Sequence, residues 1–224
     1  DSDCKNPINE ENLIDKNLTI YVKWIDIHAI PYKVVYKGEN ITDDKYSIIE
    51  TNVLYGSLNE EVVAPIKTYE GLEVISSDVK GQIVLDGSLV LEMLYQRKTY
   101  EVTYIIHGEE YEKVTDLKYN TKYKLIDNVM LKGYIFRGWY VDDQFKKVAS
   151  LNQIPSHDTI VYGKLEPITV GSSGLSYVLN PSKTGYIISG YTGTETEIII
   201  PNGYNCLPVV AIDCYFAVSY THLR

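Results

Sequence analysis

Two short segments of the chain alternate outward and inward side chains with a period of two residues, which is the pattern of a half-buried β-strand. They are residues 32–36, with the sequence YKVVY, and residues 100–104, with the sequence YEVTY. A glycine follows closely after each segment, Gly38 after the first and Gly108 after the second. The pattern therefore predicts a strand at each of these positions.

Other patterns add strands and few helical turns. Residues 89–95 predict a longer apolar strand, and they follow Asp86-Gly87, a pair typical of hairpin turns. Residues 198–200 are three isoleucines before a proline, which predicts a buried strand with a sharp end. Only residues 10–16 and 144–151 suggest one or two turns of helix. Strands should therefore dominate the fold.

The composition fits a folded protein and excludes several classes. The 224 residues correspond to one large domain or two to three small ones. Hydrophobic residues make up 45% and charged residues 23%, which excludes disorder over most of the length. No run approaches the roughly 18 apolar residues of a membrane helix. The net charge of −9 argues against nucleic acid as a partner.

Tyrosine is the dominant aromatic residue, with 21 Tyr against 3 Phe and 2 Trp. Tyrosine favours strands and can lie half-buried with its hydroxyl in water, so we expect thin β domains with little interior. The three cysteines are Cys4, Cys206 and Cys214, too few for a disulfide framework. Cys206 and Cys214 either pair or stay free. No Cys-x-x-Cys pair or Cys/His cluster predicts a zinc site.

The sequences at the two ends of the chain indicate that it is a fragment of a longer gene product. The chain starts with Asp1 and carries no signal peptide, which for a secreted protein means that the start is missing. Residues 218–224, VSYTHLR, match the translation of a transposon-end adapter used in sequencing libraries, so we expect read-through there; the alternative is a genuine tail.

An internal repeat with an offset of 141 residues relates the start of the chain to a later part. Residues 21–24 resemble residues 162–165, and at the same offset Asp1 meets Asp142. Since repeats decide the architecture, residues 1–24 are predicted to be the C-terminal part of a module whose full copy comes later.

The full copy resembles a known family. Residues 133–140, GYIFRGWY, resemble the core motif of the Listeria–Bacteroides repeat, also called the internalin B-repeat. The resemblance extends over residues 99–166 and implies a small β-grasp-like module. The repeat usually closes in LYAKW, and this copy has Leu165 where the partial copy keeps Trp24. Trp139 is expected to be a core residue, and its truncation should cost about 3–5 kcal/mol.

Two further resemblances flank this module. Residues 32–98 resemble the mucin-binding MucBP repeat, through Tyr69-Glu70-Gly71-Leu72 and the run at 86–91, which implies another small β-grasp-like fold. Residues 174–217 resemble about one leucine-rich repeat of the bacterial BspA type, and a single repeat should be poorly stable alone. Residues 171–174, GSSG, are predicted to be a flexible joint before it.

No catalytic, cofactor-binding or metal-binding residue is predicted. Ser156-His157-Asp158 contains the letters of a triad, but consecutive residues cannot point at one another, so a turn is expected. Asp142-Asp143 lacks the further oxygens that calcium needs, and a turn is expected there too. The chain has no GxSxG, P-loop or dinucleotide motif.

The predicted architecture is mainly β or α+β, with tandem small β-grasp-like modules followed by a truncated leucine-rich-repeat segment. The resemblances imply a non-catalytic region of a bacterial surface or secreted protein that acts in adhesion or in protein or glycan binding. Its partner would be a host glycoprotein, glycan or matrix protein, and the chain would be monomeric, with no cofactor and no membrane insertion. The alternatives are a passive stalk spacer and an accessory region of a cell-wall or glycan-degrading enzyme.

Overall fold

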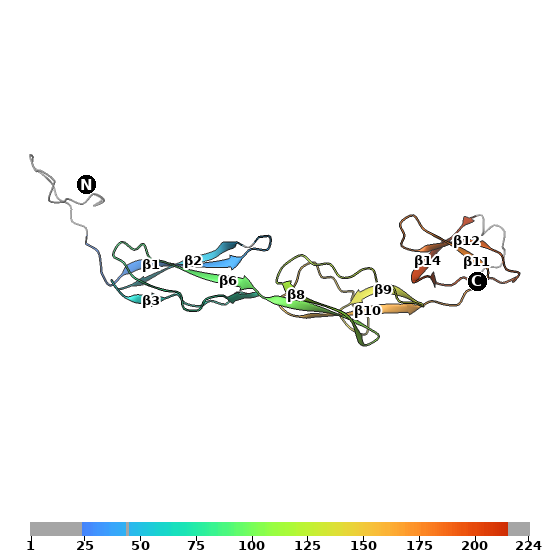
Figure 1. The fold of residues 1–224 in the computed structure, drawn as a ribbon, viewed down its shortest axis with the longest axis horizontal. Helices are drawn as coiled ribbons and strands as arrows, with labels where there is room; N and C mark the ends of the chain where they lie inside the picture. Colours follow the sequence, from blue (N-terminus) through green and yellow to red (C-terminus); the bar gives the residue numbers. More distant parts are fainter. Residues whose placement is uncertain (1–23, 44, 215–224) are drawn as a thin grey trace, which may run out of the picture. The chain divides into compact units, whose positions relative to one another are not determined.

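The structure is a computed structural model that describes residues 24–43 and 45–214, where it defines fourteen β-strands (Figure 1). Contacts divide the chain into two compact units, one that ends at Arg97 and one that begins at Lys98. The predicted mainly β fold class is therefore confirmed. None of the described residues forms a helix of the length and apolarity that a bilayer crossing requires. The predicted helical turns at 10–16 lie outside the described residues, as do the predicted module at 1–24, except its last residue, and the tail at 218–224.

The first unit contains one four-stranded sheet and a two-stranded ribbon. Its strands are β1 (Ile30–Glu39), β2 (Tyr46–Gly56), β3 (Glu61–Val63), β4 (Leu72–Val74), β5 (Lys80–Gln82) and β6 (Val90–Arg97). The sheet has the order β2-β1-β6-β4, in which the two central strands β1 and β6 are parallel and the outer strands are antiparallel to their neighbours. The ribbon pairs β3 with β5. The strands predicted at 32–36 and 89–95 thus lie in β1 and, apart from Leu89, in β6.

The hairpin predicted at Asp86-Gly87 is wrong, although a turn is present. Gly87 has a φ of 69°, and the carboxylate of Asp86 accepts the backbone N–H of Ser88 at 2.9 Å. The strand that follows, β6, pairs with β1 and β4 and not with the strand before the turn. A local turn signal does not fix the strand partner, because pairing is decided by burial of the whole sheet.

Residues 64–69, between β3 and β4, form no helix or strand, and buried tyrosines of the sheet hold this segment in place. Tyr36 and Tyr95 are almost completely buried. The hydroxyl of Tyr36 donates to the carbonyl of Pro65 at 2.9 Å, and the hydroxyl of Tyr95 bonds both the N–H and the carbonyl of Lys67, at 3.1 and 3.0 Å. Backbone groups outside helices and strands need such partners when they are buried. The expectation that tyrosine hydroxyls lie in water is therefore wrong for these residues.

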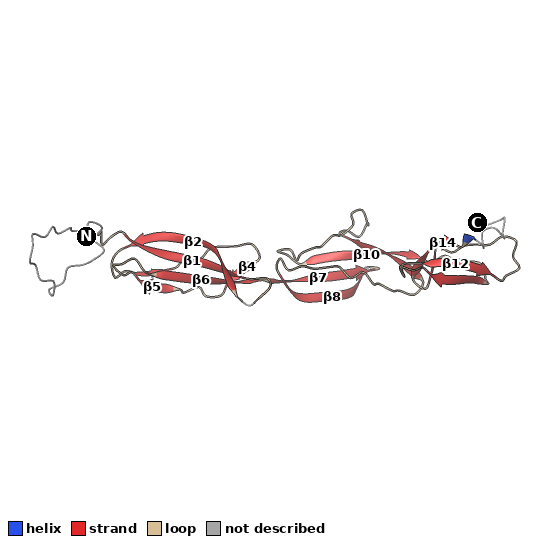
Figure 2. Cartoon of the chain, turned by 90° about the horizontal axis from the view of Figure 1, so that it is seen from above, coloured by secondary structure: helices blue, strands red, loops and turns tan. Residues whose placement is uncertain are grey.

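The second unit begins with a sheet of the same topology (Figure 2). Its strands are β7 (Thr99–Ile106), β8 (Glu109–Lys118), β9 (Tyr134–Tyr140) and β10 (Thr159–Pro167). In the order β8-β7-β10-β9, the parallel central pair is β7 and β10, which come first and last in the chain, as β1 and β6 do in the first unit. The strand predicted at 100–104 lies in β7. A two-residue turn, His107-Gly108, joins β7 to β8 with φ values of 55° and 82°, as a type I′ hairpin requires.

The core of this sheet is built around Trp139, as the sequence predicts. Only 4% of the side chain is exposed, and its indole N–H donates to the carbonyl of Ile126. Its ring packs edge-on against those of Tyr104 and Phe136, with centroids 4.7 and 5.1 Å apart. Gly163 on the neighbouring strand leaves room for it, since a β-carbon there would lie 2.9 Å from the indole ring.

The helical turns predicted at 144–151 are absent. Their backbone groups bond to β9 and its loop instead: the N–H of Ala149 donates to Trp139 and the N–H of Val141 to Lys147. Tyr140 and Val148 form an isolated bridge. The segment therefore folds back along the end of β9, and these long-range bonds replace helical ones.

A third sheet follows, with strands β11 (Leu175–Leu179), β12 (Tyr186–Tyr191), β13 (Gly203–Tyr204) and β14 (Leu207–Ile212) in the order β11-β12-β14-β13. The strand predicted at 198–200 is wrong, because Ile199 bonds a loop residue, Ser172, through both its N–H and its carbonyl. Ser172 belongs to the segment 171–174 that the sequence predicts as a flexible joint, and that prediction stays a prediction. Cys206 and Cys214 are free, so they do not pair.

Candidate binding site

The face of the β7–β10 sheet opposite the core carries a groove. Because side chains alternate along a strand, burial of Val102, Tyr104 and Ile106 turns Ile105 to the other face. On β10, Ile160 is 51% exposed on this same outer face. The groove has a volume of about 510 Å³, which lies in the range of small-molecule sites. We call it the outer groove, and its principal lining residues are Ile105, His107, Asp143, Phe145, Ile160 and Tyr162.

The wall of the outer groove is the turn after β9, which Asp142 organises. Its carboxylate accepts the backbone N–H groups of Gln144, Lys146 and Lys147 at 3.1, 3.2 and 3.2 Å. The bond from Lys146 contributes most to holding the pKa of Asp142 below its usual value. The expectation of a turn at Asp142-Asp143 is therefore confirmed.

Phe145 is held in this turn in an unusual conformation. Its φ is 55°, a left-handed value that is rare for a bulky residue and costs on the order of 1–3 kcal/mol. The strain is local to the groove wall and brings the ring edge-on to Tyr140, with centroids 5.5 Å apart. Strained residues of this kind are concentrated at ligand sites, so the conformation of Phe145 makes the outer groove a candidate binding site.

A cation and further rings surround this wall. The ammonium group of Lys164 lies 5.7 Å from the ring centroid of Tyr140 and 5.9 Å from that of Phe145. At the hairpin end of the groove, the ring of His107 packs edge-on to Tyr134 at 5.1 Å. The groove thus combines an apolar floor with aromatic and charged groups at its rim. Such an arrangement binds ligands that have both apolar faces and polar edges.

Asp158, the last residue of the Ser156-His157-Asp158 run, has a structural partner. Its carboxylate accepts the backbone N–H of Glu101 at 3.0 Å, so it holds the start of β7. In residues 24–43 and 45–214, no three His, Cys, Asp or Glu side chains are grouped to hold a metal ion. Sequence reasoning missed the outer groove because it placed residues 144–151 in helical turns. The signal that indicates a turn instead is Asp142, whose carboxylate accepts the backbone N–H groups that follow it, shortly before Phe145.

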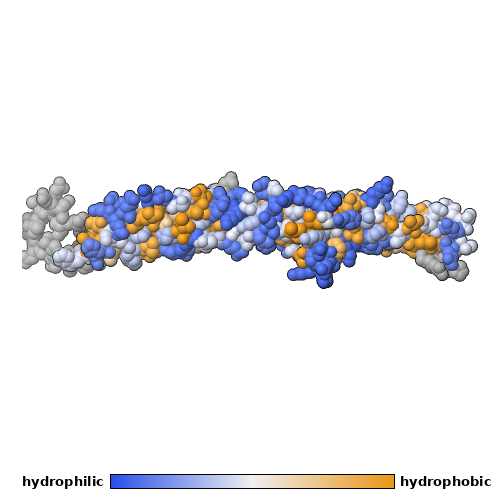
Figure 3. All heavy atoms as spheres, turned by 90° about the horizontal axis from the view of Figure 1, so that it is seen from below, coloured by the Kyte–Doolittle hydropathy of each residue, from blue (hydrophilic) through white to orange (hydrophobic). Residues whose placement is uncertain are grey.

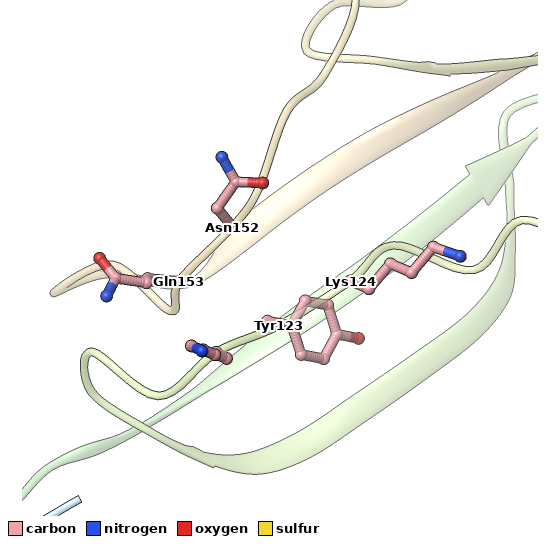
Figure 4. Close-up of a pocket in the computed structure, with 5 residues that line it drawn as sticks. Tyr123, Lys124, Asn152 and Gln153 are labelled. Atoms are coloured by element: carbon pink, nitrogen blue, oxygen red, sulfur yellow. The ribbon is translucent and has the colours of Figure 1, made fainter.

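A second open groove, of about 470 Å³, lies between residues 122–124 and 152–153 (Figure 4). The backbone N–H of Tyr123 donates to the carbonyl of Asn152 at 3.0 Å, which joins the two segments. Figure 4 shows the amides of Asn152 and Gln153 directed away from Tyr123 and Lys124. Because its polar groups do not converge on one point, this groove is a weaker candidate.

Comparison with known proteins supports the repeat prediction for the middle of the chain. Residues 100–164 match the family model of the Listeria-Bacteroides repeat domain, which confirms that resemblance. A solved structure of Streptococcal High Identity Repeats in Tandem (SHIRT) domains 3-4 from a cell surface protein matches with a TM-score of 0.23 and 14% identity, covering 61% of this chain and 98% of its own. A TM-score this low carries no structural argument. No curated protein matches the chain.

The matched segment is therefore similar to a repeat-domain family. It contains β8, β9 and most of β7 and β10, together with the whole outer groove apart from Leu165. The glycine of the GWY motif has a physical explanation in this structure. Gly138 has a φ of 110°, which side-chain-bearing residues rarely adopt. It lies where the pairing of β9 with β10 shifts register.

Proposed function

We propose that the chain is a non-catalytic repeat region of a bacterial surface or secreted protein, and that it binds a glycan or protein through the outer groove. The match of residues 100–164 to a repeat domain supports the class. The observation that carries the binding role is the groove itself, with the strained Phe145 as its wall.

The chemistry of the groove favours a host glycan or glycoprotein. A sugar ring has an apolar face that packs on aromatic rings and hydroxyl groups that hydrogen-bond at its edge. Phe145 and Tyr162 offer the rings, while Asp143 and His107 offer polar groups beside them. A pocket with a few polar groups among apolar ones is the general form of a ligand site.

Binding of the whole chain to panels of glycans and matrix proteins tests this proposal. Once a ligand is found, Phe145→Ala and Tyr162→Ala should each weaken its binding about tenfold or more, because each removes a ring from the groove. Trp24→Ala is the matched control, since Trp24 is an aromatic residue outside the groove and 91% exposed. A ligand whose affinity is unchanged by both groove variants would bind elsewhere.

The two alternatives predict different results. A passive spacer binds nothing in these panels. An accessory region of a cell-wall or glycan-degrading enzyme predicts a catalytic domain elsewhere in the uninterrupted gene. The same gene would test the proposed extracellular location through a secretion signal or a wall-sorting motif.

The flanking segments fit the same proposal. For residues 174–217, a leucine-rich repeat is supported by the parallel pairing of β12 with β14, in which Ile187 lies beside Ala211 and Ile188 beside Ile212. Both pairs are 24 residues apart (211 − 187 and 212 − 188), within the usual length of such repeats. For residues 32–98, the MucBP-like assignment is supported by a sheet of the same strand order as that of the repeat domain.

A further inference from the structure

The edge strand β2 of the first unit presents unpaired backbone. It is eleven residues long and pairs with β1 on one side, while no strand of the described residues pairs with its other side. From Gly56 to Glu50 the pairing with β1 runs without interruption over seven residues. In an antiparallel strand, alternate residues direct both N–H and C=O groups away from the neighbour. This edge therefore offers a regular row of donors and acceptors.

The side chains of β2 do not block that edge. Ile48, Val53 and Tyr55 are exposed by 63%, 50% and 67%, and apolar residues are visible at the surface of the first unit in Figure 3. The one charged residue of the strand is Glu50. Its carboxylate is bound by the ammonium group of Lys67 at 2.7 Å and by the hydroxyl of Tyr69.

The corresponding edge of the second unit is protected in the ways that natural sheets use. Six of the ten residues of β8 are charged: Glu109, Glu110, Glu112, Lys113, Asp116 and Lys118. The pairing of β8 with β7 shifts register twice. The edge strand β4 of the first unit is only three residues long. The pairing of β2 with β1 shifts register once, between Glu50 and Ile48. Among these edges, β2 alone combines length, an unbroken run of seven paired residues and low charge, which are the features of a strand that pairs with another chain.

We propose that β2 pairs antiparallel with β2 of a second copy of the chain, so that two first-unit sheets join into one. Such a contact is symmetric, because the same strand serves both copies. A pairing centred on Thr51, the middle residue of β2, places Thr51 beside its own copy and Glu50 beside Asn52 of the second copy. No like charges are then directly opposite; the two Glu50 residues are diagonal neighbours, and each is paired with Lys67 of its own copy. Threonine pairs are favourable across strands. This proposal replaces the expectation of a monomer and does not depend on the outer groove.

Sedimentation of the whole chain over a range of concentrations tests the proposal. The native chain should show a reversible monomer–dimer equilibrium. Val53→Lys should weaken the dimer about tenfold or more, since it adds a charge beside the pairing edge. Thr115→Lys, which adds the same charge on the exposed strand β8, should leave the equilibrium unchanged. A native chain that stays monomeric at every soluble concentration overturns the proposal.

Cross-linking tests the register and remains informative if Val53→Lys fails to fold. Directly opposed residues on antiparallel strands have Cα atoms about 4.5–5.5 Å apart, which a disulfide can span. Thr51→Cys should therefore give a disulfide-linked dimer on mild oxidation, above the background of the three native cysteines, and Thr115→Cys should not. Equal cross-linking at both positions would contradict pairing through β2.

Discussion

Trp139 offers the sharpest test of the packing argument, because the chain has two tryptophans in opposite environments. Trp139 is 4% exposed and Trp24 is 91% exposed. Replacing a buried Trp by Ala costs about 3–5 kcal/mol through lost contacts and the cavity left behind. Trp139→Ala also removes the indole donor from the carbonyl of Ile126, and an unsatisfied buried acceptor adds about 1–3 kcal/mol. We therefore expect the free energy of unfolding of the second unit to fall by at least about 3 kcal/mol.

The assay uses the second tryptophan as a control. Trp24→Ala should change stability by no more than about 0.5 kcal/mol, as exposed positions do. It also leaves Trp139 as the sole indole, so its fluorescence during urea unfolding reports the second unit alone. Circular dichroism follows Trp139→Ala, and the transition that shifts relative to the native chain is that of the second unit, since the two units need not unfold together.

A third variant separates the ring from its hydrogen bond. Trp139→Phe keeps an aromatic ring against Tyr104 and Phe136 but loses the N–H donor. It should fall between the native chain and Trp139→Ala. A loss below about 1 kcal/mol for Trp139→Ala, or equal losses at positions 24 and 139, would refute the claim that Trp139 organises this core.

Three further predictions concern single side chains. Tyr36→Phe should lower the free energy of unfolding of the first unit by about 1–2 kcal/mol in urea titration, because the carbonyl that its hydroxyl reaches loses that donor. Gly163→Ala should lower the melting temperature of the second unit, by a cost of about 1–3 kcal/mol, because its β-carbon crowds the ring of Trp139. The ammonium of Lys67 lowers the pKa of Glu50, so its stabilisation is present above the unfolded pKa near 4.5 and is lost as pH falls through the folded pKa. Thermal melts of Glu50→Gln between pH 6 and pH 3 should show a smaller acid loss than the native chain.

The outcomes that would contradict these three predictions are distinct. A Tyr36→Phe chain as stable as the native one would mean that water replaces the hydroxyl. An unchanged melting temperature for Gly163→Ala would show that the neighbouring side chains move aside at little cost. A Glu50→Gln chain with the native pH dependence would assign the acid sensitivity to other carboxylates, such as Asp142, whose pKa is also lowered.

Local pattern was sufficient for part of the fold and of the site. The alternation at 32–36 and 100–104 located two central strands, and the turn at Asp142-Asp143 is present with the carboxylate of Asp142 at its centre. The outer groove could not be predicted from local sequence pattern. It requires Phe145 to line the same groove as Tyr162 and Ile160, which lie more than a dozen residues further along the chain. The folding back of residues 144–151 along the end of β9 places Phe145 there.

The sequence by itself determined the strands at 32–36, 89–95 and 100–104, the burial of Trp139, and the similarity of residues 100–164 to a repeat family. Those properties depend on side-chain alternation and on a local motif, so neighbouring residues carry them. Tertiary structure alone decided that the strands that come first and last in the chain lie side by side in each of the first two sheets, β1 with β6 and β7 with β10. It likewise decided which backbone groups bond to the tyrosine hydroxyls. It also decided that the three isoleucines at 198–200 bond a loop instead of a strand. These choices satisfy buried polar groups across long stretches of chain, and no short window of sequence contains both partners.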